Sequence, residues 1–269
     1  MPELPEAEAV TRRLRKQAKG LTIIGAQIER PRVAGKQTAE QISERTHRAA
    51  ITAVNRRGKQ ILMRLSNGFT IRVHLGMTGD LYVILDHRFR PHTARTWLKL
   101  QGGAALLFDD PRVLGHFNVY DDAELEKALG PLGVEPLSKT FTPAVLIALA
   151  KGSKLPVKPF LMDQTKISGL GNIYSAEALF RAAIHPARKA GSLRAPRLER
   201  LHGAIISTLN DAVRSAVAAY TRPGRIREGE AFDAQVYGRK GEPCFRCGRT
   251  IARMEQAGRS TYYCPGCQT

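Results

Sequence analysis

Apolar and charged positions in the first twenty residues follow a helical period. Over residues 5–19 apolar side chains recur every three or four positions, with glutamates at the start and arginines and lysines at the end. This charge order suits the helix dipole. Pro5 fits the first turn and Gly20 fits the residue after the last. The pattern predicts a helix over residues 5–19.

From residue 21 to residue 120 the period shortens to that of β-strands. Short runs of β-branched and aromatic residues are separated by turn signals such as Asn67-Gly68 and Gly102-Gly103. About eight strands after one helix predict a β-sandwich or barrel. The predicted strands are 21–28, 49–56, 60–66, 69–75, 80–85, 96–101, 104–110 and 118–120.

The second half of the chain returns to a helical period. Thr142 and Pro143 form a helix start, and helices are predicted over 142–151, 172–183 and 194–220. No internal repeat is evident. We expect an N-terminal domain at 1–121, a linker with a short helix at 122–138, a helical domain at 139–225 and a C-terminal domain at 226–269.

All four cysteines lie in the last 26 residues, as two Cys-x2-Cys pairs separated by 16 residues. This spacing is typical of a zinc site. Four thiolates complete a closed tetrahedron, so one structural Zn²⁺ is expected, and it would supply the folding energy of this short segment. The predicted ligands are Cys244, Cys247, Cys264 and Cys267. Residues 248–263 between the pairs predict a β-hairpin with a Gly-Arg tip, where Arg259 could contact phosphate.

The charge of the chain indicates a polyanionic partner. Lys and Arg total 42 against 24 acids, for a net charge of +18 and a pI near 10.2. Nucleic acid is the favoured partner, because phosphate contacts release counterions. A basic protein without a polyanion ligand is the alternative, and an anionic membrane surface is disfavoured because no amphipathic anchor accompanies the charge. No membrane-spanning run or signal-peptide pattern is seen, so a cytoplasmic location is expected.

The opening stretch MPELPEAEAV allows two interpretations. Pro5 can simply mark a helix start. Alternatively, removal of Met1 would make Pro2 a secondary amine beside Glu3. An α-amino group has a pKa of about 7.7–8.0. The positive end of the helix dipole would lower the pKa of Pro2 and favour the neutral, nucleophilic form. A pKa of Pro2 above that of an unfolded peptide would refute this hypothesis.

Five stretches together carry a family resemblance. MPELPEAEAV, HLGMTG, DDPRVLG, GLGNIYSAEALF and the segment VYGRKGEPCFRCG to YYCPGCQ occur in this order along essentially the whole chain. With them the chain resembles the formamidopyrimidine-DNA glycosylase / endonuclease VIII family, and PELPE is more similar to the formamidopyrimidine branch. The resemblance implies an α+β multidomain fold: an N-terminal β-sandwich with a leading helix, a helix–two-turn–helix domain and a C-terminal four-cysteine zinc finger.

The resemblance also implies an activity, which is base-excision repair of oxidised DNA bases. The damaged nucleotide is flipped into a pocket between the domains. Pro2 attacks C1′ and forms a Schiff base, Glu3 protonates O4′, and β,δ-elimination cleaves the strand. Glu6 lies near the base or an ordered water, or only complements the helix dipole. Lys59, placed in a β segment, contacts phosphate, or is a solvated strand lysine.

A flipped base leaves a gap that must be filled. The resemblance implies that Met77 and Arg112 enter the duplex there, and that Arg112 hydrogen-bonds the orphan base. Without the motif, Met77 would be read as a core methionine. The family usually has an aromatic residue two positions after the arginine, whereas this chain has Leu114. Loss of stacking worth about 1–3 kcal/mol predicts altered lesion search or opposite-base preference.

The GLGNIY stretch predicts a phosphate site at a helix start. Gly169 and Gly171 allow close backbone approach, and Asn172 is expected to contact the backbone flanking the lesion. Glu177 is expected to support this turn.

Three further residues match phosphate contacts of the family. Lys158 corresponds to a phosphate-binding lysine, and Arg259 is expected to clamp phosphates around the flipped nucleotide. His74, just before the Met77 turn, is expected to assist, although a lone histidine is more often structural.

One segment departs from the family pattern. Residues 221–233 look shorter than the Gly/Ser/Thr-rich loop that covers 8-oxoguanine in formamidopyrimidine enzymes. A shorter cover predicts weaker retention of that base and readier acceptance of oxidised pyrimidines or ring-opened purines.

Three functions are therefore compared. The favoured one is a monomeric glycosylase and β,δ-lyase acting on damaged double-stranded DNA. The first alternative is a non-catalytic binder of damaged or abasic DNA on the same scaffold. The second, a zinc-ribbon protein that binds RNA or DNA structurally, leaves PELPE and GLGNIY unexplained.

Overall fold

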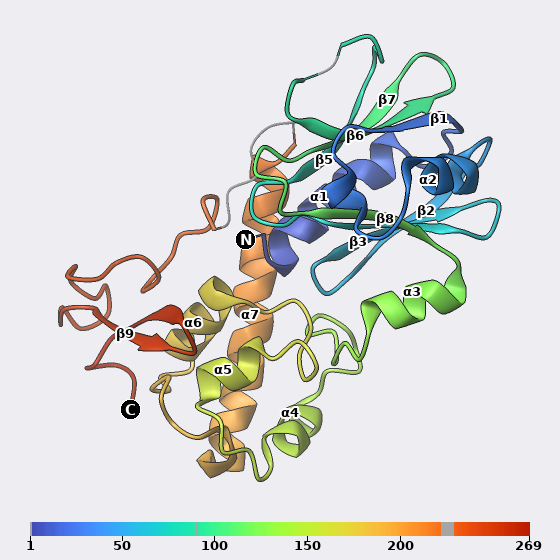
Figure 1. Ribbon diagram of the computed structural model, residues 1–269. Helices are drawn as coiled ribbons and strands as arrows, with labels where there is room; N and C mark the ends of the chain where they lie inside the picture. Colours follow the sequence, from blue (N-terminus) through green and yellow to red (C-terminus); the bar gives the residue numbers. More distant parts are fainter. Residues whose placement is uncertain (1, 90, 222–228) are drawn as a thin grey trace. The chain divides into compact units, whose positions relative to one another are not determined.

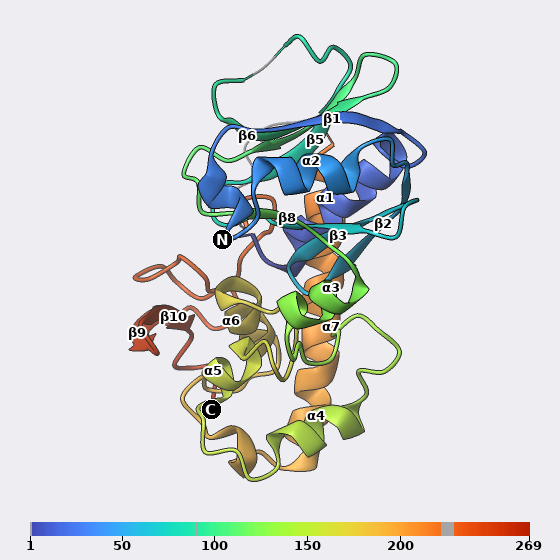
Figure 2. The same cartoon turned by 45° about the vertical axis from the view of Figure 1, so that its right-hand side comes forward.

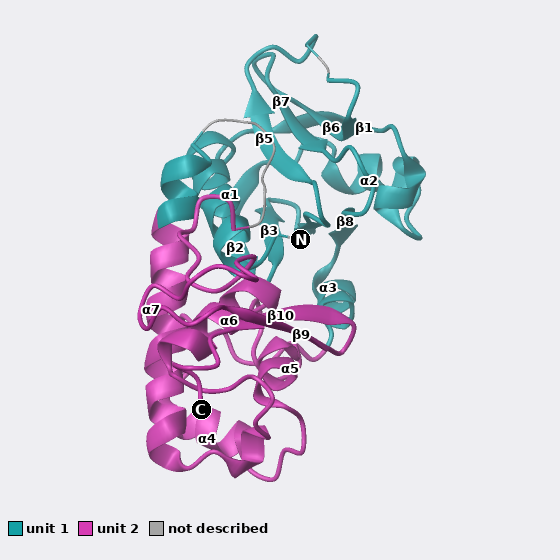
Figure 3. Cartoon of the chain, turned by 90° about the vertical axis from the view of Figure 1, so that its left-hand side faces the viewer, with its two compact units in different colours: residues 1–130, 215–228 teal, residues 131–214, 229–269 magenta. Residues whose placement is uncertain are grey.

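The computed structural model describes residues 2–89, 91–221 and 229–269. The chain forms two compact units, one of residues 1–130 with 215–228 and one of residues 131–214 with 229–269 (Figure 3). Met1, and residues 222–228 of the shortened segment, lie outside the described residues. The predictions about Met1 removal and about the lesion cover fall there.

Unit 1 carries one leading helix, eight strands and two further α-helices in its described residues (Figure 1). Its elements are α1 Leu4–Gln17, β1 Ile23–Ile28, the 3-10 turn η1 Pro31–Ala34, α2 Ala39–Thr46, β2 Ile51–Arg57, β3 Gln60–Leu65, β4 Thr70–His74, β5 Asp80–Ile84, β6 Ala94–Leu100, β7 Ala105–Asp109, β8 His116–Tyr120 and α3 Asp122–Leu129.

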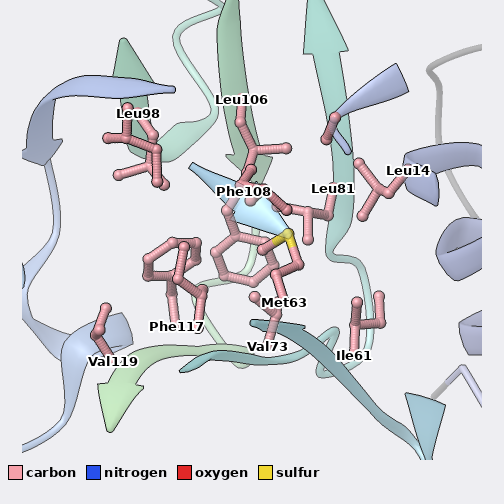
Figure 4. Packing of buried hydrophobic residues seen from close by; sticks show 14 of the residues in the cluster. Leu14, Ile61, Met63, Val73, Leu81, Leu98, Leu106, Phe108, Phe117 and Val119 are labelled. Carbon is pink, nitrogen blue, oxygen red and sulfur yellow. The ribbon is translucent and has the colours of Figure 1, made fainter. Parts of the chain in front are cut away.

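Unit 1 is a β-sandwich, as the alternating pattern predicts. Two antiparallel sheets, ordered β1-β6-β7-β5 and β2-β3-β4-β8, turn their apolar residues toward one shared core. Figure 4 shows Phe108 of β7, Phe117 of β8 and Met63 of β3 meeting inside it, with the two phenyl centroids 6.3 Å apart. Val10 and Leu14 of α1 close the same core.

The leading helix begins with a reciprocal hydrogen-bond cap. Glu3 is the N-cap, Pro5 lies in the first turn, and the helix ends two residues before the predicted boundary, with Ala18 as C-cap. Gly20 has φ +90°, a conformation that favours glycine. On the buried face, Arg13 donates to the carboxylate of Asp80 and to the Leu81 carbonyl oxygen, and so ties α1 to β5.

Unit 2 is built from helices and a C-terminal hairpin. Its elements are α4 Pro143–Ala150, α5 Val157–Met162, α6 Asn172–Arg181, the 3-10 turn η2 Ala190–Ser192, β9 Ala252–Gln256 and β10 Arg259–Tyr263, with α7 Ala195–Ala219 shared between the units. Strand β10 packs beside α6 (Figure 2). Within the described ranges, no helix combines the length and apolarity needed to cross a membrane.

Two helices were not predicted. Helix α2 starts with a Thr38/Gln41 capping box, which is a signal present in the sequence. The helix itself has only eight residues, too few to show an apolar period. Helix α5 contains Pro159 in its first turn and spans only six residues.

Candidate functional site

The start of α1 places two carboxylates and Pro2 out of solvent. Glu3 is 2% and Glu6 1% exposed, and Pro2 is buried. The Glu3 backbone N–H donates to Glu6 Oε2 over 2.8 Å, and the Glu3 side chain accepts from the Glu6 backbone. The cap therefore holds both acids at the helix end that favours negative charge.

Lys59 lies in the two-residue turn between β2 and β3, so it belongs to the expected β segment but to neither strand. Gly58 has φ +57°, and Arg57 pairs with Gln60 across the turn. Arg56 donates to Gly58 O over 2.7 Å and to Glu8 of α1 over 2.9 Å. Because α1 thus anchors the turn, Lys59 is held in place and is only 8% exposed.

His74 ends strand β4 directly before the Met77 turn. Its Nδ1 accepts the Gly76 backbone N–H over 3.1 Å, so the neutral ring carries its proton on Nε2. Burial lowers the pKa of His74 to about 4, and the nearby charges of Lys59, Arg72 and His116 add to this effect. The ring is therefore a neutral donor at pH 7.

The pH dependence of stability should report this histidine. Its folded pKa lies below its ordinary value of 6.5, so the unfolded chain takes up the proton first as pH falls. The stabilisation that comes from keeping this ring neutral is intact above pH 6.5. Between about pH 6.5 and 4 it is lost, and the free energy of unfolding falls by up to about 3 kcal/mol. His74→Asn keeps an acceptor for Gly76 but does not titrate. Urea unfolding across this range should show a smaller decline for the variant, and parallel curves would contradict the assignment.

Two loop tips of unit 1 present the predicted gap-filling residues. Met77 is 43% exposed in the turn between β4 and β5, and Arg112 is exposed in the loop between β7 and β8. Leu114 is half-buried in the same loop. Met77 is therefore not a core methionine. Between the tips lies Asp110, fully buried, whose role the sequence did not reveal.

In unit 2 the amide of Asn172 is oriented by a buried lysine. Lys158 is 1% exposed, and its ammonium donates to Asn172 Oδ1 at 2.5 Å, Thr261 Oγ1 at 2.9 Å and Ser260 O at 3.0 Å. These three contacts use the three ammonium protons. Lys158 therefore braces α6 against the hairpin, and Asn172 Nδ2 is left facing Tyr237 Oη at 3.2 Å.

The GLGNIY turn forms the start of α6, with Gly171 as N-cap and Asn172 as its first residue. Gly169 has φ +89°, which explains the glycine, and its N–H donates to Gln164 Oε1. The α6 N-terminus thus lies beside the Asn172 amide, an arrangement suited to an anion.

Glu177 supports a different segment from the one expected. Its buried carboxylate accepts the backbone N–H groups of residues 235, 236 and 237 over 2.8–3.0 Å, not those of the GLGN turn. Burial raises its pKa, and the three N–H groups oppose that rise. Glu177 therefore fixes the stretch that leads into the cysteine-rich segment onto α6.

The predicted hairpin is present, with a slightly different tip. Ala257 and Gly258, with φ +49° and +70°, form the turn, and exposed Arg259 is the first residue of β10. Arg259 and Lys158 line an open pocket of ≈ 260 Å³ together with neighbouring residues of α5 and the turn. Arg259 and Asn172 both belong to unit 2.

The four cysteines converge as a metal site requires. All four Sγ atoms lie within 4.8 Å of one another, with the Cys244–Cys267 sulfurs 3.9 Å and the Cys247–Cys264 sulfurs 3.4 Å apart. A tetrahedral zinc with bonds of about 2.3 Å separates its sulfurs by about 3.8 Å. The four thiolates therefore fit one structural zinc, with no position left for a reacting water.

Three family models match the chain in succession. They are the formamidopyrimidine-DNA glycosylase N-terminal domain over residues 1–117, the formamidopyrimidine-DNA glycosylase H2TH domain over residues 132–222, and the zinc finger found in FPG and IleRS over residues 241–269.

Curated and solved relatives agree over the full length. Formamidopyrimidine-DNA glycosylases of Pelotomaculum thermopropionicum and Xanthomonas oryzae are each 38% identical, covering 100% of this chain and 99% and 100% of theirs. A Lactococcus lactis FPG variant bound to Fapy-dG-containing DNA superposes with a TM-score of 0.90 at 30% identity, covering 100% of both chains. The Thermus thermophilus FPG protein superposes at 0.85 with 36% identity, over 99% of this chain and 98% of that one. The chain belongs to the formamidopyrimidine-DNA glycosylase family.

Proposed function

We propose that this chain is a base-excision DNA glycosylase with abasic-site lyase activity that uses Pro2 as nucleophile. The observation that carries the proposal is the buried Pro2–Glu3–Glu6 group at the start of α1. A glycosylase of this family needs an amine and an acid next to one another at the start of its leading helix. Here they are consecutive residues, held by a helix cap that also fixes their direction.

The chemistry follows from these two groups. The neutral Pro2 nitrogen forms a bond to C1′, and the C1′–O4′ bond breaks with its electron pair moving to O4′. O4′ takes the proton of Glu3, which acts as general acid. The Glu3 carboxylate formed in this way accepts the proton of the Pro2 nitrogen, whose lone pair then expels the damaged base. The base leaves with the electron pair of its bond to C1′ and takes up that proton. The product is a cationic iminium, from which β- and δ-elimination cleave the strand on both sides of the sugar. Since α1 begins at Leu4, its positive end lies beside Pro2 and favours the uncharged amine.

DNA contacts are assigned within each unit. In unit 1, Lys59 and the Nε2–H of His74 are proposed to contact phosphate. In unit 2, the Asn172 amide and Arg259 are proposed to do so. Met77 and Arg112 are proposed to fill the gap left by the base, with Leu114 as a wedge without aromatic stacking. The ligand is damaged double-stranded DNA, and a monomer acting in the bacterial cytoplasm is inferred.

The Asn172 contact gives a sharp prediction. Asn172→Asp keeps an acceptor for Lys158 but loses the Nδ2 donor and adds a negative charge. The affinity for a lesion duplex should fall by about a hundredfold, because a charged hydrogen bond is replaced by repulsion, while the melting temperature should not fall. Asn67→Asp, in an exposed turn of unit 1, adds the same charge and should change affinity less than about threefold. Equal affinities for both variants in fluorescence anisotropy would remove Asn172 from the interface.

A lesion panel tests the function as a whole. Duplexes carrying formamidopyrimidines, 8-oxoguanine, thymine glycol or dihydrouracil should each be assayed for released base and for strand cleavage. We expect release and cleavage together, with formamidopyrimidines among the substrates. Tight binding of these duplexes with no released base and no cleavage would favour a non-catalytic binder.

A further inference from the structure

We propose that Asp110 and Thr78 act as positioning residues that join the two gap-filling loops of unit 1 into one rigid element. This inference rests on the proposed function, since it concerns how Met77 and Arg112 are presented to DNA. It adds two residues, neither of which is placed in contact with DNA.

Asp110 is the centre of the arrangement. It is fully buried, and its Oδ2 accepts the backbone N–H groups of Leu114 at 2.7 Å and Gly115 at 2.8 Å. Its Oδ1 accepts from the Thr78 hydroxyl at 2.6 Å. One carboxylate therefore holds the Arg112 loop from within and reaches across to the Met77 turn. Hydrogen bonds to a charged acceptor are stronger than neutral ones.

Thr78 forms the bridge in both directions. Its hydroxyl donates to Asp110, and its oxygen accepts the Arg112 backbone N–H at 3.3 Å. The residue directly before it is Met77, and the residue whose amide it receives is Arg112. The one hydroxyl thus lies between the two side chains proposed to enter the duplex.

The loop backbones are also in direct contact. A Cβ placed on Gly76 would lie 2.5 Å from the backbone of Leu114 and Gly115, and one on Gly115 would lie 2.7 Å from His74 O. Gly76 itself has φ +65° and Val113 has φ +54°. Such a close fit leaves no room for one loop to move without the other.

A buried arginine of β6 fixes the Arg112 loop from beneath. Arg95 is 9% exposed and donates to Asp110 O at 2.7 Å and Pro111 O at 3.2 Å. The Asp110 backbone N–H in turn donates to Thr93 O at 3.1 Å. The base of the joined element is therefore attached to the sandwich, and only its tips, Met77 and Arg112, project.

Rigid presentation has a kinetic consequence. Loops whose backbones are fixed before insertion lose less conformational entropy when their tips replace the extruded base. The unstacking cost is then recovered as the base leaves the stack. Separating the two loops should therefore slow excision of a stacked lesion.

The test uses the full-length protein and the pair Thr78→Val and Thr78→Ser. Valine keeps the shape but removes the hydroxyl, whereas serine retains it. Single-turnover excision from a lesion duplex should slow about tenfold to a hundredfold in Thr78→Val and stay within about threefold of wild type in Thr78→Ser. In a Met77→Ala/Arg112→Ala background, Thr78→Val should add less than about threefold, because its effect passes through these two tips.

Each outcome decides the inference. Wild-type excision rates in Thr78→Val would overturn it. So would a full additional slowing in the Met77→Ala/Arg112→Ala background, which would indicate a general structural role, or a slowing that serine fails to restore. Asp110→Asn should repeat the Thr78→Val pattern more weakly, since the amide oxygen can still accept from Gly115. A wild-type protein that excises no lesion would overturn the proposed function, whereas an active wild type with an unaffected Thr78→Val would overturn the inference alone.

Discussion

Glu3→Gln should lose base excision by about 10²–10⁴-fold while keeping its fold. This is the range that a positioned general acid contributes. Glutamine retains the side-chain oxygen that accepts the Glu6 backbone N–H, so the cap of α1 should persist. Single-turnover release of the damaged base measures the loss, and thermal unfolding should show a change equivalent to less than about 1 kcal/mol.

A matched control exists in the first turn of α2. Glu40→Gln makes the same chemical change at an exposed acid of another capped helix. Its excision rate should remain within about twofold of wild type. A Glu3→Gln protein that excises at the Glu40→Gln rate would remove Glu3 from the chemistry.

Cys247→Ser should remove the zinc and thereby weaken DNA binding by unit 2. Cys247 is exposed, so its replacement by serine disturbs little packing. The variant therefore tests the loss of one metal ligand. Structural zinc supplies about 10–16 kcal/mol in small fingers. Without the zinc, the β9–β10 hairpin should unfold. Arg259 would then lose its position, and Lys158 would lose its hydrogen bond to Thr261. Affinity for an abasic duplex should fall by about 10²–10⁴-fold, as expected when the two hydrogen bonds of Arg259 and Asn172 to charged phosphates are both weakened.

Arg259→Ala provides the comparison, because it removes one contact from a hairpin that stays folded. It should keep one zinc per chain by elemental analysis and lose about tenfold to a hundredfold in affinity. Full affinity in a zinc-free Cys247→Ser protein would show that the hairpin is not needed for binding.

Much of the architecture could be predicted from the sequence because local patterns express it. Alternation along residues 21–120 indicated the sandwich, and the cysteine spacing indicated the zinc site. The short helix α2 was missed because eight residues hold only two turns of periodic signal. Lys59 was expected only in a β segment, whereas the structure places it in the turn that Gly58 makes between β2 and β3.

The sequence indicated the candidate residues that stand in the motifs, but not the distant partners that hold side chains in place. Pro2, Glu3 and Asn172 stand in quoted motifs. The partners of Lys158 lie 14 and 102–103 positions away, and the carboxylate of Glu177 binds a segment 58–60 positions on. Asp110 and Thr78 are 32 positions apart. Such pairings are set by packing, which a single sequence does not display.

The most direct test of the account is to identify the residue that bonds to DNA. Protein incubated with an abasic-site duplex and borohydride should yield a stable covalent adduct, because reduction converts the iminium to an amine. Peptide mapping by mass spectrometry should place the adduct on the nitrogen of Pro2, in chains that have lost Met1. An adduct mapped to a lysine, or full cleavage activity in chains that retain Met1, would contradict the account.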